Sequence, residues 1–429
     1  MQLVAYGAQD VFLTGNPKVT FFQAVYKRHT NFAMETIEQT INGTAASSGR
    51  ISVTVARNGD LVGEMFLELT TVGSLATSLN GGLGASGCWA AERAVEDVEL
   101  SIGGQRIDKH YQRWWRLYSE LYLDESKKVN WGKLTTNATG LANKVYLPLI
   151  FFFNRNPGLF LPLIALQYHE VRLDFDLSSE FSNYFGTGTK VWANYVYLDT
   201  EERRRFAQKG HEYLIEQVQH TGDDAVEAAG TKQVRLSYNH PVKEHVWCFN
   251  DGAGSNAGMW NFTSNAGTDG TVVLQSDPTA LSNVLVPTTW GTGCPMYHAG
   301  TGEGGSSHQW VEEGAPSATL STGPLSTFKL ILNGQDRFKE QPGKYFNQMQ
   351  SYNHHSGTPY PGIYSYSFAL KPEEHQPTGT CNFSRIDNAQ VEVVQKAGTG
   401  TATNTLNMFA VNYNVLRIQS GMGGLAFSN

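Results

Sequence analysis

ELSIGGQRIDKH (Glu99–His110) is repeated in the second half of the chain as KLILNGQDRFKE (Lys329–Glu340). A second pair of similar segments follows in the same order, ANYVYLD (Ala193–Asp199) and VNYNVLR (Val411–Arg417). Matches that keep their order along the chain are typical of a tandem duplication. The matched positions are Leu100/Leu330, Gly104/Gly334, Gln105/Gln335, Lys109/Lys339, Asn194/Asn412, Tyr195/Tyr413 and Leu198/Leu416. The sequence therefore predicts one fold that occurs twice.

Length and composition agree with two β-rich domains. The chain has 429 residues, which is long for one hydrophobic core, and size scaling favours two domains of about 215 residues. It contains 44 glycines, only 17% charged residues and 12% aromatic residues. This profile is typical of β-sandwiches with long loops.

Apolar residues alternate with polar ones in many short segments. In VRLDFDL (residues 171–177), for example, every second side chain is apolar. Period-two alternation buries one side of a strand and exposes the other, which favours antiparallel sheets over a doubly wound parallel sheet. The expected strands cover residues 51–55, 64–69, 98–102, 171–177, 234–238, 328–332, 364–370 and 391–394. We expect an all-β fold.

Helical patterns are few. His110–Glu125 places Trp114, Leu117, Tyr118, Leu121 and Tyr122 on one helical face, which predicts a helix packed on the first sandwich. A platform for a sugar or a base is the alternative interpretation of these aromatic residues. Asp199–Phe206 has Glu201 four residues before Arg205 and predicts a helix that opens the connection between the halves. Long loops are expected at residues 70–92, 124–144 and 250–324.

The net charge and the lack of long apolar segments argue against nucleic-acid binding and membrane insertion. The formal net charge of −7 disfavours direct binding to nucleic acid, which requires clustered Lys and Arg. The N-terminus lacks a basic, apolar leader, and the FFF run at residues 151–153 is too short to span a bilayer. We expect a soluble protein made in the cytosol.

Common catalytic and cofactor signatures are missing from the sequence. It contains no GxxxxGK[ST], HExxH, GxSxG or EF-hand pattern. His240, His245 and the His354–His355 pair do not have the spacing of a metal site by themselves. The four cysteines, Cys88, Cys248, Cys294 and Cys381, share no CxxC spacing and are expected to be free thiols. We expect no enzyme activity, no catalytic residue, no cofactor and no metal.

Six segments in order strongly resemble the double jelly-roll major capsid proteins of nucleocytoplasmic large DNA viruses, with the algal-virus members the most similar. The resemblance runs from end to end and is interrupted mainly at the long loops. The segments are GAQDVFLTGNPKVTFFQAVYKRHTNFAMETIEQTI (7–41), LPLIALQYHEVRLDFDL (161–177), YLDTEERRRFAQ (197–208), LSYNHPVKEHVWCF (236–249), YSYSFALKPEEHQPTGTCNFSRIDNAQ (364–390) and FAVNYNVLRIQSGMGGLAFSN (409–429).

This resemblance implies two tandem eight-stranded antiparallel jelly-roll sandwiches with long loops and a few short helices. It also implies a homotrimeric, pseudo-hexagonal capsomer that tiles an icosahedral capsid in the virion. The implied partners are neighbouring capsomers and minor capsid proteins at the inner face, close to an internal viral membrane, with no direct contact to nucleic acid. Synthesis and assembly are expected in the host cytoplasm.

The resemblance also assigns regions of the chain. We expect an N-terminal assembly segment at residues 1–25, the first jelly roll at 26–212 and the second at 213–429. The expected assembly residues are Asn16, Pro17, Lys27, Arg28 and His29. Turn chemistry offers an alternative in which Asn16-Pro17 only directs the chain into its first strand. Among the N-x-S/T sequons, Asn137 and Asn261 lie in expected outer loops and are candidate glycosylation sites.

Two other classes of function stay open at this point. A carbohydrate-binding, lectin-like β-sandwich could use exposed tryptophans. A glycosidase on a β scaffold would need two carboxylates that face one cleft. Neither class requires a duplicated scaffold. A minor capsid or penton protein is a further alternative, but such proteins usually have a single roll.

Overall fold

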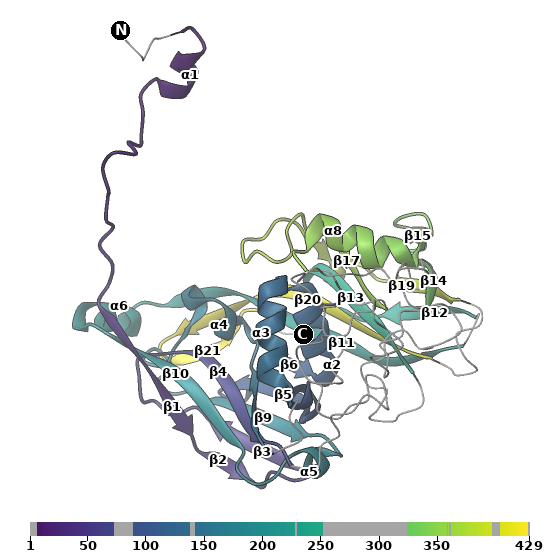
Figure 1. Cartoon of the computed structure of the whole chain (residues 1–429), viewed down its shortest axis with the longest axis horizontal. Coiled ribbons are helices and arrows are strands. Elements are labelled where there is room, and N and C mark those ends of the chain that lie inside the picture. Colours follow the sequence, from purple (N-terminus) through teal and green to yellow (C-terminus); the bar gives the residue numbers. More distant parts are fainter. Residues whose placement is uncertain are drawn as a thin grey trace, which may run out of the picture.

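The computed structural model describes residues 7–72, 89–137, 142–227, 230–251, 324–357, 359, 362–396 and 404–427. Residues 32–198 form two antiparallel sheets that face each other (Figure 1). One sheet has the order β1-β10-β4-β7, with β8 beside β4, and the other has the order β2-β3-β9-β5-β6. The strands are β1 (Phe32–Gln39), β2 (Ile41–Gly43), β3 (Arg50–Thr54), β4 (Leu61–Thr70), β5 (Val95–Ile102), β6 (Gln105–Tyr111), β7 (Lys144–Pro148), β8 (Leu161–Pro162), β9 (Val171–Leu177) and β10 (Lys190–Leu198).

Residues 211–425 form a second pair of antiparallel sheets. Their orders are β11-β20-β13-β17, with β18 beside β13 and β21 beside β20, and β12-β19-β14-β15, with β16 beside β14. The strands are β11 (His211–Val226), β12 (Thr231–Leu236), β13 (Pro241–Asp251), β14 (Leu325–Leu332), β15 (Gln335–Asp336), β16 (Gln341–Pro342), β17 (Ile363–Ser367), β18 (Cys381–Asn382), β19 (Ala389–Gln395), β20 (Asn404–Gln419) and β21 (Met422–Leu425).

The two halves have the same topology. In each, the last long strand (β10 or β20) lies between the first strand (β1 or β11) and a strand from the middle of that half (β4 or β13). This arrangement of two facing antiparallel sheets is that of a jelly roll, and β2 extends one path of the first half to five strands. The expected all-β fold of two tandem jelly rolls is confirmed, with β8, β16, β18 and β21 as short additions.

The repeated segment that begins at Glu99 forms the same hairpin in both halves. Gly103–Gly104 joins β5 to β6 with φ of 58° and 83°, and Asn333–Gly334 joins β14 to β15 with φ of 50° and 77°. Positive φ at both central residues is the geometry of a type I′ turn, which Gly and Asn adopt most readily. Leu100 and Leu330 are both buried before the turn. The sequence match therefore records an equivalent structural position.

The second repeated segment lies on the equivalent strands β10 and β20. Thr36 of β1 donates a hydrogen bond to Asn194 Oδ1 (2.6 Å), and Asn412 Nδ2 donates to Gln217 Oε1 of β11 (3.3 Å). Each asparagine thus links its strand to the first strand of its own jelly roll. The matched tyrosine Tyr195 is fully buried.

The connection from β6 to β7 contains helices α2 (Gln112–Leu121) and α3 (Glu125–Thr135). The helix expected over 110–125 is confirmed as α2, but Trp115 is also buried, off the expected apolar face. The reason is that α2 lies between the two jelly rolls (Figure 1): Trp114 packs against Phe409 of β20 at a ring separation of 5.7 Å, and Trp115 Nε1 donates to Pro148 O of β7 (3.2 Å). The loop expected at 124–144 is wrong over α3, which Asp124 caps by accepting from Lys127 N (2.7 Å).

The remaining helices are short, and α6 is the one expected near residue 200. Asp199 caps α6 by accepting from Glu201 N (3.0 Å), and α6 buries no residue on the way from β10 to β11. Within the described ranges, no helix is both long enough and apolar enough to cross a bilayer. The helices are α1 (Asp10–Thr14), η2 (Ala90–Arg93), α4 (Phe152–Arg155), η3 (Pro157–Leu159), α5 (Phe181–Tyr184), α6 (Thr200–Gln208), the π-helical turn η5 (Tyr345–Met349), α8 (Gln350–His354) and η6 (Phe383–Arg385).

Candidate functional site

A segment of residues 7–31, here called the arm, projects away from the jelly rolls (Figure 1). It begins with the single turn α1, in which Thr14 Oγ1 donates to Asp10 O (2.7 Å). Asn16 ends this turn with φ of 50°, in the left-handed region that Asn tolerates, and Pro17 follows it. Because β1 begins only at Phe32, this turn directs the chain out of α1 and not into the first strand.

The arm carries many apolar side chains, and all of them are exposed. Burying one such side chain contributes roughly 1.5–3 kcal/mol, so an exposed series of them is typical of a surface that binds another molecule. The exposed fractions are Val11 57%, Phe12 91%, Leu13 85%, Val19 69%, Phe21 91%, Phe22 98%, Val25 78% and Tyr26 89%. Sequence analysis did not single out these residues, although the runs VFL and FF mark them.

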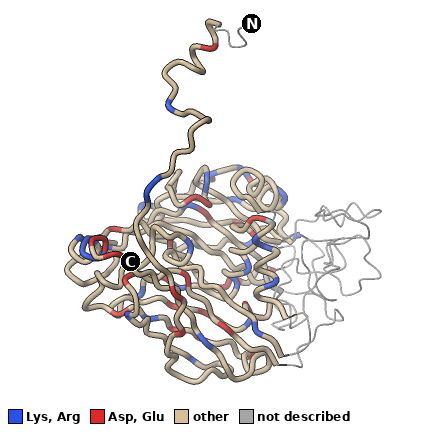
Figure 2. The backbone as a smooth tube through the Cα atoms, turned by 60° about the vertical axis from the view of Figure 1, so that its left-hand side comes forward, with Lys and Arg blue, Asp and Glu red and all other residues tan. Residues whose placement is uncertain are grey.

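The base of the arm is basic. Lys27, Arg28 and His29 are all exposed, and the two cations lie where the arm joins the body (Figure 2). The His29 ring meets the Phe32 ring edge to face at 6.5 Å. The arm contains three Lys or Arg residues and one Asp, a net charge of +2, whereas the whole chain has −7. The structure thus brings the five expected assembly residues together on one exposed segment; their role stays a prediction.

The strand that follows the arm forms one edge of its sheet. Phe32 and Met34 of β1 are 52% and 50% exposed. They lie on the outer face, because Ile37 and Gln39 pair with the buried residues Ala193 and Val191 on the inner face. The arm and the outer face of β1 therefore both present exposed apolar side chains, separated by the polar residues 27–31.

The second candidate region is the boundary between the two jelly rolls. The core of the first roll continues into the second through buried residues of β11, β13 and β20 such as Ile215, Val246 and Phe409. Val218 N donates to Asp108 Oδ1 (3.0 Å), and Gln217 Nε2 donates to Ile107 O, so side chains connect the edge strands β6 and β11. These contacts place the two rolls against each other as one body.

A buried cluster of charged residues crosses this boundary. Glu216 of β11 accepts from Lys243 Nζ of β13 (2.6 Å) and from Arg155 Nη2 of α4 (3.0 Å). Burial works to raise the pKa of Glu216, but the charges of Lys243 and Arg155 outweigh it and lower the pKa. Burial lowers the pKa of Lys243, and the Glu216 charge opposes that change. We name this set, together with Tyr122, Glu244, His355 and Glu373, the seam cluster.

His355 forms the other half of the seam cluster. Its Nε2 is hydrogen-bonded to Glu244 Oε1, its Nδ1 lies 3.4 Å from Glu373 Oε1, and the side chains of His355 and Glu244 are inaccessible to solvent. Burial works to lower the pKa of His355, but the Glu244 carboxylate and then Glu373 raise it to about 9. The imidazolium is therefore the expected form at neutral pH. The sequence analysis missed this cluster, although Lys243-Glu244 in an apolar strand marks it.

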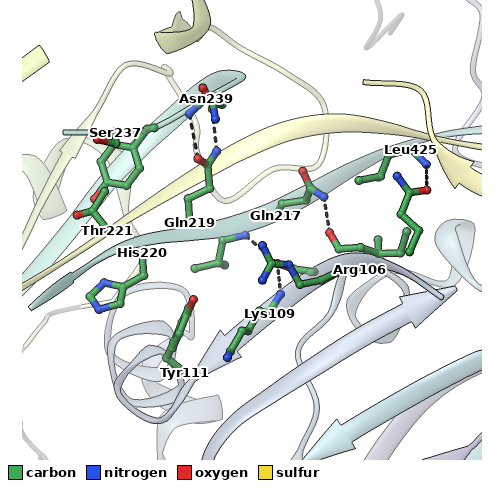
Figure 3. A pocket seen from close by; sticks show the side chains of 15 residues that line it. Arg106, Lys109, Tyr111, Gln217, Gln219, His220, Thr221, Ser237, Asn239 and Leu425 are labelled. Atoms are coloured by element: carbon green, nitrogen blue, oxygen red, sulfur yellow. Dashed lines mark hydrogen bonds between the residues drawn. The ribbon is translucent and has the colours of Figure 1, made fainter. Parts of the chain in front are cut away.

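A groove of about 410 Å³ lies along the same boundary (Figure 3). Its polar side chains mostly bond to each other or to backbone: Gln219 Nε2 donates to Asn239 O (2.7 Å), and Gln105 Oε1 accepts from Leu425 N (3.1 Å). Lys109 pairs with Asp97 (3.0 Å). We interpret the groove as part of the contact between the rolls and not as a ligand site.

The histidines considered for metal binding have different surroundings. His245 is buried among the rings of Tyr238, Phe368 and Phe383, and this burial lowers its pKa to about 3. His355 belongs to the seam cluster. In the part of the chain that the structure describes, no group of three or more His, Cys, Asp or Glu side chains is placed to hold a metal ion.

Of the two candidate glycosylation sites, the structure describes Asn137 but not Asn261. Asn137 is buried, and its Nδ2 donates to Thr71 Oγ1 (2.7 Å). A glycan on this nitrogen would require the amide to leave that contact. Asn261 lies outside the described residues, as do Cys88, Cys294 and three of the nine tryptophans.

Of the six described tryptophans, Trp192 is half-buried and Trp89, Trp114, Trp115, Trp131 and Trp247 are buried, so none of the six provides the exposed platform of a lectin.

Comparison with protein families assigns both halves of the chain. Residues 20–199 match the family described as major capsid protein N-terminus, and residues 202–424 match the family described as large eukaryotic DNA virus major capsid protein. The major capsid protein of Paramecium bursaria Chlorella virus 1 is 43% identical, with 100% of this chain and 99% of that protein covered. The major capsid protein of Phaeocystis pouchetii virus is 39% identical over the same shares.

Solved structures give the same result. The crystal structure of PBCV-1 VP54, fitted into a reconstruction of the virophage Sputnik, has a TM-score of 0.75 and 38% identity, covering 96% of this chain and all of that one. The Faustovirus major capsid protein has a TM-score of 0.68 at 12% identity, covering 96% and 94%, which shows a shared fold.

Proposed function

Since this chain belongs to the family of large eukaryotic DNA virus major capsid proteins, we propose that three copies associate into a pseudo-hexagonal capsomer that tiles an icosahedral shell. The protein is a structural component of the viral capsid. The observation that carries the proposal is the presence in one chain of two jelly rolls whose main strands follow the same order. A threefold ring of such chains has six similar lobes and can meet six neighbours in a flat layer.

A cyclic trimer requires a heterologous contact that closes after three copies. Obligate contacts of this kind commonly bury on the order of 2,000–5,000 Å². The seam cluster and the shared core favour this arrangement, because they fix the angle between the two lobes within a chain. A ring closes only if that angle is the same in every copy.

We assign the arm to contacts made after the trimer has formed. Its exposed apolar side chains and its net charge of +2 suit neighbouring capsomers or minor capsid proteins at the inner face of the shell, close to an internal viral membrane. Asn16, Pro17, Lys27, Arg28 and His29 belong to this surface. Synthesis and assembly take place in the host cytoplasm, without direct contact to nucleic acid and without a catalytic role.

Light scattering coupled to size exclusion tests the trimer. We expect a mass three times that of the 47.3 kDa chain. A variant that begins at His29 is the matched control and should have the mass of three shortened chains, because residues 7–28 make no backbone hydrogen bond with the described part of the body. A full-length protein that remains monomeric at all concentrations would refute the trimer. A truncated variant that becomes monomeric would contradict only the role given to the arm.

A further inference from the structure

Strand β1 has an open edge. It pairs with β10 along its whole length and, among the described residues, with no other strand. One edge of its eight residues therefore presents unpaired backbone N–H and C=O groups. Such an edge is a template for another strand, and proteins usually shield it with charges, bulges or a covering segment. The outer side chains beside this edge include the half-exposed Phe32 and Met34.

The arm contains a segment suited to such pairing. Residues 18–26, KVTFFQAVY, are rich in β-branched and aromatic residues, which favour strands. This segment makes no backbone hydrogen bond with the described residues of the jelly rolls. Its nine residues are enough to cover the eight of β1. Open backbone groups and a strand-forming segment without a partner thus occur in the same molecule.

We propose that residues 18–26 of one copy add as an antiparallel strand to the open edge of β1 in a second copy. The pairing completes the backbone hydrogen bonds of the β1 edge and covers Phe32 and Met34 with arm side chains. The charges are compatible with it, since segment 18–26 carries one charged residue, Lys18, and β1 carries the exposed Glu35 and Glu38, which also bond to Tyr197 (3.1 Å) and Lys190 (2.9 Å) of β10. This inference rests on the proposed function, because it names the partner of the arm within the shell.

The tether between arm and strand favours a second copy over the arm's own β1. Residues 27–31 lead the arm away from its own strand (Figure 1). The tether, KRHTN, contains neither Gly nor Pro and only one residue that tight hairpin turns prefer, Asn31. Five residues span at most about 17 Å. The two copies must therefore place their β1 strands near each other, which is a restriction on how they meet.

Disulfide trapping between two different chains tests the pairing. One chain carries a single new cysteine in the arm (Thr20→Cys, Phe22→Cys or Ala24→Cys, which share one strand face and sample the register) and the other carries Thr36→Cys in β1. After joint assembly and mild oxidation, we expect a covalent dimer with one chain of each kind for at least one arm position. Lys232→Cys on β12, another exposed edge strand, is the matched acceptor control and should give no dimer.

A second variant checks that backbone pairing causes the cross-link. Val25→Pro removes a backbone N–H from the arm and should abolish the cross-link, whereas Val25→Ala should keep it. The proposal is overturned if no arm position links to Thr36→Cys, or if the link forms only within a chain that carries both cysteines. Light scattering on the same samples reports the trimer separately, so a trimer without cross-links contradicts this inference alone.

Discussion

The hydroxyl of Tyr122, the C-cap residue of helix α2 in the first jelly roll, donates a hydrogen bond of 2.5 Å to Glu244 Oε2, on strand β13 of the second. Glu244 is fully buried. Tyr122→Phe removes this donor from a buried carboxylate, so we expect the free energy of unfolding to fall by about 1–3 kcal/mol. Denaturant unfolding followed by tryptophan fluorescence measures the change.

Tyr352→Phe is the matched control for that substitution. Tyr352 is 85% exposed, so its hydroxyl should contribute little. Equal unfolding curves for Tyr122→Phe and the unmodified chain would show that the contact does not hold the two rolls together.

Stability should depend on pH through His355. Its pKa in the folded chain is about 9, above the ordinary value of 6.5, because Glu244 and Glu373 outweigh the effect of burial. A raised pKa means that protonation favours the folded state, so this contribution is complete below about pH 6.5 and is lost as pH rises through 9. The melting temperature of the unmodified chain should therefore fall over this range more than that of His355→Gln.

His29→Gln is the control for replacing a histidine by glutamine at an exposed position of the arm. Its melting temperature should follow that of the unmodified chain at every pH. A His355→Gln variant with the same slope between pH 6.5 and 9 would assign the pH dependence to other groups.

The two duplicated hairpins should contribute similarly to the free energy of unfolding. Leu100 and Leu330 occupy equivalent positions before the two type I′ turns and are both buried. We expect Leu100→Ala and Leu330→Ala each to lower the free energy of unfolding by about 2–5 kcal/mol. Leu370→Ala, at a position 74% exposed, should change it by less than about 0.5 kcal/mol. A large cost at only one of the two hairpins would contradict their equivalence.

Brief treatment with trypsin should remove the arm first. Lys18, Lys27 and Arg28 are exposed and lie outside any helix or strand, and the sequence from 252 to 323 contains no Lys or Arg at which trypsin could cut. Mass spectrometry should find a resistant product that begins at His29, with an unchanged melting temperature. The same sites should be protected after assembly. Early cleavage elsewhere, with the arm intact, would show that the arm is bound to the body.

Much of the fold could be predicted from local patterns. The alternation in residues 171–177 matches β9, and the paired turns at Gly104 and Gly334 mark the duplication, because period and turn chemistry depend on neighbouring residues. Helix α3 was missed, since its apolar residues have little periodicity and its cap, Asp124, is a single side chain. The predicted buried face of α2 did not include Trp115, because the periodicity argument assumes that a helix is covered on one side. A helix between two jelly rolls is covered on more than one side.

The candidate site was predictable only in part. The family resemblance assigned an N-terminal assembly segment at residues 1–25, but no local pattern shows that the apolar side chains of the arm are exposed in the described structure. The seam cluster joins Arg155, Glu216, Lys243 and His355, which are far apart in sequence. Their proximity depends on how the two rolls pack, and one sequence without coordinates does not specify that packing.

Helix α6, which connects the two lobes, buries none of its residues, whereas the lobes share a core and a set of enclosed ion pairs. The covalent link is therefore not what holds the halves in register. Cleavage of one peptide bond in α6 should leave the two lobes of the chain associated with unchanged shape. It follows that mechanical load on a capsid built from this chain passes through the side-chain packing between the two lobes of each subunit. The connecting peptide can then vary in length without altering the shape of the subunit.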